Sequence, residues 1–147
     1  MGDHMRRPLI AACVVLASVA LSAGCDNSGS STVASPAPIL STATFSGTVD
    51  PGGKASNSFT VGQSGGEVDI TLTAAGPPAT IFMGLGVGTP STDGTTCTVP
   101  NGQSVNAQAG TTPQLVGTAA PGTYCVSVFD IGNQTATISY TVTVAHP

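Results

Sequence analysis

The chain has 147 residues, and its 3 basic against 7 acidic side chains give a formal net charge of −4. This charge balance excludes nucleic acid as a partner, because phosphate binding requires clustered lysine and arginine. Hydrophobic residues make up 40% of the chain and recur regularly, which excludes a wholly disordered protein, and the prevalence of Thr, Ser, Gly and Val is typical of β-sheets with an uncharged polar surface.

The N-terminal region has the three parts of a secretory signal peptide. Arg6 and Arg7 form a basic start, residues 8–23 are uncharged and rich in Ile, Val, Leu and Ala, and small residues close the run. A transmembrane helix needs roughly 17–25 apolar residues, whereas this run has about 16 and no basic patch follows it. We therefore expect residues 1–24 to be a signal peptide, with residues 1–4 an upstream extension or a cloning remnant.

The apolar run ends in the sequence Ser-Ala-Gly-Cys at residues 22–25, which resembles the lipobox of bacterial lipoproteins. The sequence departs from the commonest lipobox in carrying its leucine, Leu21, one place early. The resemblance implies a diacylglycerol thioether on Cys25, cleavage before it and acylation of the new N-terminus. It also implies a bacterial cell envelope location with the membrane as a partner, because two acyl chains hold a protein stably on a bilayer. The alternative is an ordinary signal peptide in which Cys25 occurs by chance.

Residues 25–41, which follow the cleavage point, have the composition of a flexible linker. Ser, Thr, Pro, Ala and Gly fill this segment, and the Ser-Pro-Ala-Pro run at residues 35–38 favours extended, polyproline-like conformations. We expect it to act as a tether between the lipidated cysteine and a folded domain.

Residues 42–147 are expected to form one β domain. Short segments of alternating polar and apolar residues are separated by turn residues, such as Pro51 and Gly52 in the centre of a type II turn, and none suits a helix of useful length. The expected strands are residues 45–49, 58–61, 68–73, 81–88, 96–99, a weaker one near 105, 115–117, 123–130 and 138–144. This spacing predicts an all-β fold, an antiparallel, jelly-roll-like β-sandwich of about 8 strands.

One expected strand, residues 81–88, has an unusual division of its two faces. Ile81, Met83, Leu85 and Val87 share one face, whereas every second residue from 84 to 88 is glycine. A strand face without side chains allows another segment to pack directly on the backbone. We expect such a close contact here.

The cysteines also point to an oxidising compartment. Cys13 leaves with the signal and Cys25 is the lipidation site, so Cys97 and Cys125 remain as a pair. A disulfide between them would close a loop of roughly 29 residues and contribute about 3.5 kcal/mol by the chain-entropy estimate. The competing interpretation, a cysteine-ligated metal, would need additional nearby ligands that the pair lacks.

A series of core and turn residues resembles one known family over most of the domain. In chain order the matching elements are Phe45-x-Gly47, Phe59-x-Val61, Gly66-x-Val68-x-Ile70-x-Leu72, Pro121-Gly122-Thr123-Tyr124 and Tyr140-x-Val142-x-Val144. The pattern is similar to the bacterial pre-peptidase C-terminal (PPC) domain. The resemblance implies a non-catalytic β-sandwich tied to secretion, solubility or substrate contact. Residues 79–82 lack the acids that family members often carry there, so calcium and collagen binding are not implied.

Catalytic residues are not evident. His146 is penultimate in the chain, which is a poor position for a catalytic triad, and we expect it to be a solvated tail residue. Glu67 and Asp69 lie two apart on the outward face of an expected strand. A catalytic carboxylate pair needs one acid in an apolar pocket, so these two are expected to be solvated surface charges.

Ligand binding is the main alternative to a purely structural role. Asp50, Asp93 and Asp130 fall in or next to expected turns, where oxygen ligands suit Ca²⁺, but no calcium-loop motif surrounds them. Sugar platforms usually present exposed aromatic residues, whereas Trp is absent and Tyr124 and Tyr140 fall on inward faces.

The sequence therefore favours a non-enzymatic cell-envelope lipoprotein that displays a single β-sandwich as a structural or protein-interaction module. No catalytic residue, metal site or cofactor is predicted. Envelope proteins or surface polymers are the expected partners besides the membrane. The alternative is a carbohydrate- or calcium-binding module of the cell surface.

Overall fold

The computed structural model describes residues 40–147, and in this part of the chain every regular element is a β-strand. The strands are β1 (Ser41–Val49), β2 (Lys54–Val61), β3 (Gly66–Gly76), β4 (Phe82–Pro90), β5 (Cys97–Thr98), β6 (Ser104–Gln108), β7 (Leu115–Ala119), β8 (Gly122–Phe129) and β9 (Ile138–His146). The predicted all-β fold is confirmed. The first strand begins at Ser41, one residue before the expected domain boundary.

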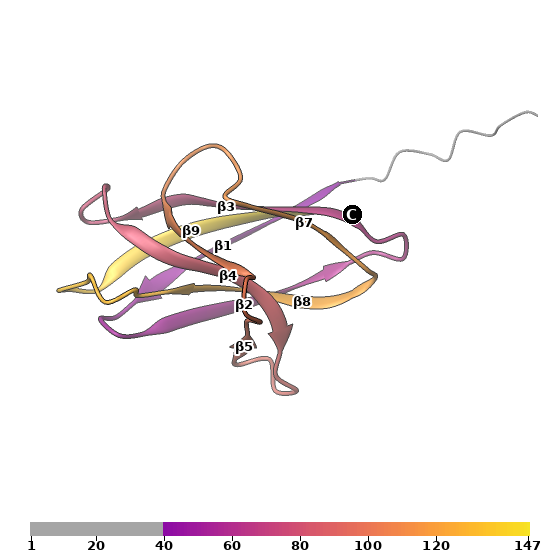
Figure 1. The fold of residues 1–147 in the computed structure, drawn as a ribbon, viewed down its shortest axis with the longest axis horizontal. Coiled ribbons are helices and arrows are strands. Elements are labelled where there is room, and N and C mark those ends of the chain that lie inside the picture. The colour runs from indigo at the N-terminus through magenta and orange to yellow at the C-terminus, as the bar shows by residue number, and fades with distance from the viewer. Residues whose placement is uncertain (1–39) are drawn as a thin grey trace, which may run out of the picture. The chain divides into compact units, whose positions relative to one another are not determined.

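Two antiparallel sheets face each other as a sandwich (Figure 1). The first sheet has four strands in the order β1-β9-β3-β7, and the second has five, with β2-β8-β4 followed by β5 and β6, which both pair with β4. Consecutive strands from β1 to β4 alternate between the sheets, so neither sheet is built from local hairpins alone. The strand β7 ends the first sheet on one side and β1 ends it on the other.

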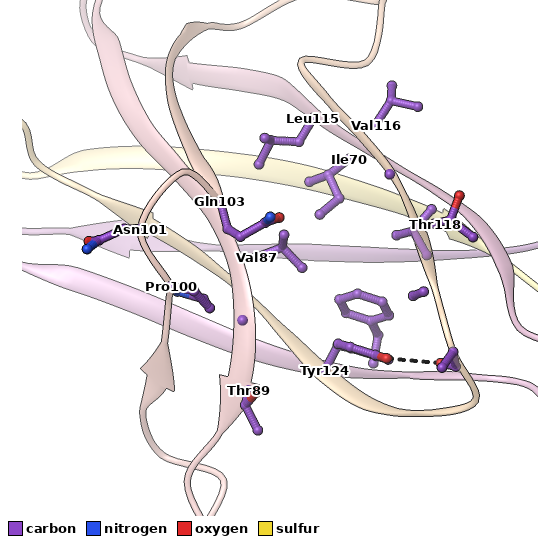
Figure 2. Close-up of a pocket in the computed structure, with 16 residues that line it drawn as sticks. Ile70, Val87, Thr89, Pro100, Asn101, Gln103, Leu115, Val116, Thr118 and Tyr124 are labelled. Carbon is purple, nitrogen blue, oxygen red and sulfur yellow. Dashed lines mark hydrogen bonds between the residues drawn. The ribbon is translucent and has the colours of Figure 1, made fainter.

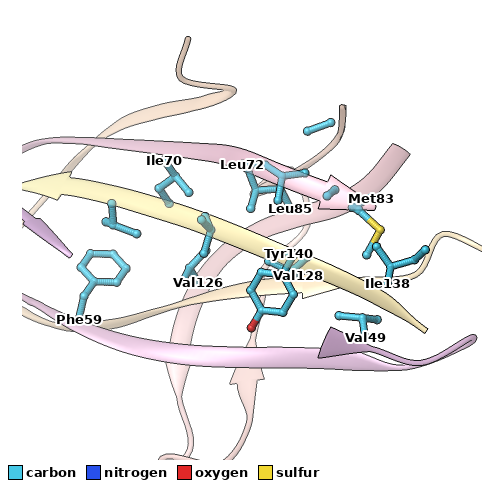
Figure 3. Packing of buried hydrophobic residues seen from close by; sticks show 14 of the residues in the cluster. Val49, Phe59, Ile70, Leu72, Met83, Leu85, Val126, Val128, Ile138 and Tyr140 are labelled. Carbon is cyan, nitrogen blue, oxygen red and sulfur yellow. The ribbon is translucent and has the colours of Figure 1, made fainter. Parts of the chain in front are cut away.

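The core lies between the sheets and follows the period-two pattern of the sequence. Along β9, the residues Ile138, Tyr140, Val142 and Val144 are at most 4% exposed, and the polar residues between them face outward. Figure 3 shows Ile138 and Tyr140 in the same core as Leu72 of the adjacent strand β3 and as Met83 and Val126 of the opposite sheet. Full burial of one such aliphatic side chain contributes about 1.5–3 kcal/mol, so the core supplies most of the stabilisation.

The expected polar outer face of β3 is interrupted. The pairing with β9 shifts between Leu72 and Ala74, so that Ala75 returns to the core after the irregularity. Gln114 holds the strand next to this shift, since its Oε1 accepts the Leu72 amide at 2.7 Å. Thr71, on the outward face of the strand, is only 8% exposed.

The glycine face of β4 is covered, as expected. A Cβ built on Gly84 would overlap the ring of Phe129, one on Gly86 would lie 2.9 Å from Val99, and one on Gly88 would overlap the Thr98 carbonyl. The Phe129 ring therefore covers Gly84, and residues 91–103, here called the covering segment, pack on the backbone of β4 at Gly86 and Gly88. Only glycine permits this approach on that face.

The predicted disulfide between Cys97 and Cys125 is present, with a Cα–Cα distance of 5.7 Å. It joins β5, within the covering segment, to β8 in the centre of the second sheet. Both sulfur-bearing residues are buried. The bridge therefore fixes the covering segment against the outer side of the sheet.

Candidate functional site

The predicted signal peptide, the predicted lipidation site Cys25 and nearly all of the predicted tether lie outside the described residues. Within residues 40–147, no helix is long and apolar enough to cross a membrane. The described part also contains no group of three or more His, Cys, Asp or Glu side chains arranged to hold a metal ion.

His146 is not the solvated tail residue that its position suggested. Strand β9 continues through His146, which pairs with Ser41 at the start of β1 and is only 9% exposed. Its ring centroid lies 5.4 Å from that of Phe59, and Nδ1 lies 3.1 Å from the Pro147 carbonyl oxygen. The prediction was wrong because packing against a distant strand, rather than chain position, decides the burial of this residue.

The two acids of β3 also differ from each other. Glu67 is exposed, as expected for a surface charge, whereas Asp69 is half-buried. Its Oδ1 atom is buried without a hydrogen-bond partner in the described part of the chain. Both residues lie on the outward face of β3, so they do not form a carboxylate pair inside an apolar pocket.

Asp130 organises two neighbouring turns at one end of the sandwich. Its Oδ2 accepts the Gly52 amide at 2.7 Å, and its Oδ1 accepts three amides from residues 132–134 at 2.9–3.3 Å. The Gly52 hydrogen bond is the main cause that lowers the pKa of Asp130 below its ordinary value. The Gly53 amide donates to the Asp50 carbonyl at 2.7 Å and Gly52 has φ +71°, which confirms the expected type II turn.

Asp50 and Asp93 also accept hydrogen bonds, Asp50 from a distant residue and Asp93 within its own turn. Asp50 Oδ1 accepts a hydrogen bond from the Thr137 hydroxyl at 2.6 Å. Asp93 accepts hydrogen bonds from Ser91 and from the amide and hydroxyl of Thr95, and the Ser91 bond is the largest cause that lowers the pKa of Asp93 to about 2. The carboxylates considered for Ca²⁺ are therefore engaged by hydrogen-bond donors of the chain itself, and the described part of the fold does not gather them into one cluster.

A cleft of about 370 Å³ opens at the side of the sandwich, between β7 and the covering segment. We call it the β7 cleft (Figure 2). Its apolar lining comes from both sheets and includes Phe59, Val68, Ile70, Val87, Leu115 and Tyr124. Its volume falls within the range of about 300–1,000 Å³ that is typical of ligand sites.

Each wall of the β7 cleft is held in place by hydrogen bonds. On one side, the Val87 amide donates to the Gln103 carbonyl at 3.0 Å, which places Pro100 and Gln103 at the rim. On the other side, the Tyr124 hydroxyl donates to the Ala120 carbonyl at 3.0 Å and braces the turn between β7 and β8. These contacts join the rim to the rigid parts of both sheets.

The lining of the β7 cleft carries no charged side chain among its sixteen residues. An ion placed in the cleft would lose hydration without gaining a partner, which is costly. The cleft therefore favours an uncharged, largely apolar ligand. Its hydroxyl groups, on Thr89, Thr118 and Tyr124, have no histidine, lysine or carboxylate beside them in the lining to act as a base.

The β7 cleft was not predicted from the sequence. Residues 115–117 were expected to be a strand, but their place at the end of a sheet depends on the topology. The only sequence feature that points to the cleft is Gly117, which leaves a gap in the side chains of that strand. This feature is weak, because the gap forms a cleft only through the position of the opposite sheet.

Comparison with known proteins gives no match: neither a protein-family model nor a curated protein sequence is significantly similar to this chain. The resemblance to the PPC domain therefore rests on the core and turn residues alone.

Proposed function

We propose that the protein is a non-enzymatic, lipid-anchored component of the bacterial cell envelope, and that its PPC-like β-sandwich is displayed there as a binding module. The observation that carries the binding role is the β7 cleft, an uncharged apolar opening between Leu115 and Gln103 in a disulfide-braced sandwich. Binding rather than catalysis is supported because such a lining offers shape and apolar contact without reactive groups.

The anchoring half of the proposal is supported by the sequence around Cys25. A basic start, an uncharged run and small residues directly before a cysteine suit attachment of acyl chains to its thiol. Two or more chains hold a protein stably, at about 0.8 kcal/mol per buried CH₂.

Metabolic labelling with a palmitate analogue tests the anchor. The wild-type chain expressed in a bacterium should incorporate the label and fractionate with membranes. Cys25→Ser should lose both properties, whereas the matched variant Cys13→Ser, changed inside the signal, should keep them. Label that persists in Cys25→Ser would contradict the anchor.

Carbohydrate binding is the second candidate, and the outer face of the first sheet favours it. Hydroxyl side chains dominate this face and consist of Thr42, Thr44, Ser46, Thr48, Thr73, Ser139, Thr141 and Thr143. Ser46 Oγ and Thr141 Oγ1 lie 3.0 Å apart. Hydroxyls both donate and accept hydrogen bonds, as sugars require.

A glycan array probed with the full chain tests this second candidate. Binding that is lost in Thr141→Val would support it, and an array without specific binding would reject it. Calcium has weaker support, because Asp50, Asp93 and Asp130 accept hydrogen bonds from their own chain. Calorimetry with Ca²⁺ should therefore detect no saturable heat.

A further inference from the structure

Strand β7 presents an unpaired backbone edge. It pairs with β3 through Leu115–Ala119, and no strand within residues 40–147 lies on its other side. Natural edge strands are commonly protected by lysine, proline or an inward charge. The β7 sequence, Leu-Val-Gly-Thr-Ala, has none of these, and Val116 on it is 61% exposed.

The interior directly beneath this edge is open. Gly117 lies opposite Val68, a core residue, so its missing side chain would point between the sheets. A Cβ built on Gly117 would meet nothing within 4 Å, and Gly117 is exposed despite facing inward. The space that a side chain would fill at this point is therefore part of the β7 cleft.

The opposite edge of the same sheet is different. Gly47 on β1 also lies on the inward face, between Phe45 and Val49. A Cβ there would lie 2.9 Å from Tyr140 Oη, so the interior beside β1 is filled. The core is thus filled beside the edge strand β1 and open beside the edge strand β7.

We propose that the β7 cleft binds an extended, uncharged peptide segment of another protein, which adds to the first sheet as a fifth strand against β7. This inference rests on the proposed binding function and names its partner. Alternate side chains of the added strand would enter the cleft between Ile70 and Val87, where the apolar lining lies.

A peptide fits both features of the site at once. The edge of β7 offers a repeat of backbone donors and acceptors, which another strand matches along its whole length. Successive side chains of a strand point to opposite faces, so every second residue would face the cleft. The uncharged lining selects apolar residues at those positions, since a buried charge would be unpaired.

The disulfide supports the wall of the β7 cleft that contains Pro100 and Gln103, because this wall lies close to Cys97 in the chain. Pro100 and Gln103 come shortly after Cys97, which the bridge holds against β8. The added strand would thus lie between a free edge on one side and a fixed wall on the other.

Binding is measured by fluorescence anisotropy on the mature, acylated chain in detergent. The probe is a labelled, end-capped peptide of seven residues with alternating valine and threonine. We expect saturable binding that Gly117→Leu weakens at least tenfold by filling the cleft. The matched control is Thr60→Leu, which introduces the same side chain at an exposed position of β2 outside the cleft lining and should change the affinity less than twofold.

Two isomers of the probe, N-methylated on alternate amides of opposite parity, separate strand addition from simple apolar insertion. For a strand that adds antiparallel to β7, the valine face fixes which amides turn toward β7, so one isomer should lose binding at least tenfold and the other should keep it. Equal binding of both isomers, or wild-type affinity in Gly117→Leu, would overturn the proposal.

A second copy of the chain is the other occupant to be tested. If sedimentation shows a dimer that Gly117→Leu dissociates, the proposed foreign peptide is wrong. Thermal melting verifies that both leucine variants are folded. Failure of peptide binding would leave acylation of Cys25 unchanged, so it is distinguishable from failure of the proposed envelope anchor.

Discussion

Cys125 lies directly opposite Gly88 in the ladder between β8 and β4, and its disulfide partner Cys97 crosses the glycine side of β4. The glycines of β4 leave room for the covering segment to lie on the second sheet, and the disulfide holds the segment there. This arrangement also sets one wall of the β7 cleft.

Gly88→Ala should destabilise the domain. The added methyl group would overlap the Thr98 carbonyl, a backbone atom that cannot rotate away. Overpacking of this kind costs about 1–3 kcal/mol. The free energy of unfolding in urea measures the loss, and Gly117→Ala is the matched control, with an expected change near zero or slightly stabilising. Equal stability of the two variants would contradict the close packing on β4.

Replacement of both Cys97 and Cys125 by serine should lower the free energy of unfolding by about 2–5 kcal/mol, the usual effect of removing a disulfide from a small domain. Chemical denaturation with and without reductant measures it, and reductant should not affect the double variant. Two free thiols in the non-reduced wild-type domain, seen by mass spectrometry, would be the opposing result.

Leu72→Ala tests the centre of the core. Leu72 is fully buried on β3, so truncation should cost about 2–5 kcal/mol through lost contacts and a residual cavity. Leu72→Met conserves volume and should cost less than about 1.5 kcal/mol. Thermal and urea unfolding compare the two variants. An unchanged free energy of unfolding in Leu72→Ala would contradict the tight packing of the core around Leu72.

Much of the fold follows from local pattern. The alternation from Ile138 to Val144 predicts which residues enter the core, and the glycines of β4 predict a close neighbour without identifying it. Both are decided within one strand, where side chains point to alternate faces. The disulfide likewise follows from the number of cysteines left in the domain.

The site could not be predicted in the same way, because it depends on contacts between distant segments. The β7 cleft combines Phe59, Gln103 and Gly117 from three regions of the chain. Burial of His146 requires Phe59 beside it. Local alternation carries no information about which strand ends a sheet.

Asp130→Asn should reduce stability at neutral pH and weaken its dependence on acid. The folded-state pKa of Asp130 is lowered from 3.8, chiefly by the Gly52 amide. Its contribution is present above the unfolded pKa and is lost as the pH falls through the folded pKa, because the unfolded chain takes up the proton first. Melting temperatures between about pH 6 and pH 2 should therefore converge for wild type and variant. A constant difference across this range would contradict the role assigned to the carboxylate.

Amide hydrogen exchange of β7, measured with and without the valine–threonine peptide, tests the proposed site most directly. Successive amides of β7 point alternately toward β3 and toward the free edge. The amides that point toward the free edge should exchange faster than those of the central strand β9, and the peptide should slow them selectively. Edge amides that are already protected in the free protein, or unchanged by saturating peptide, would contradict strand addition at β7.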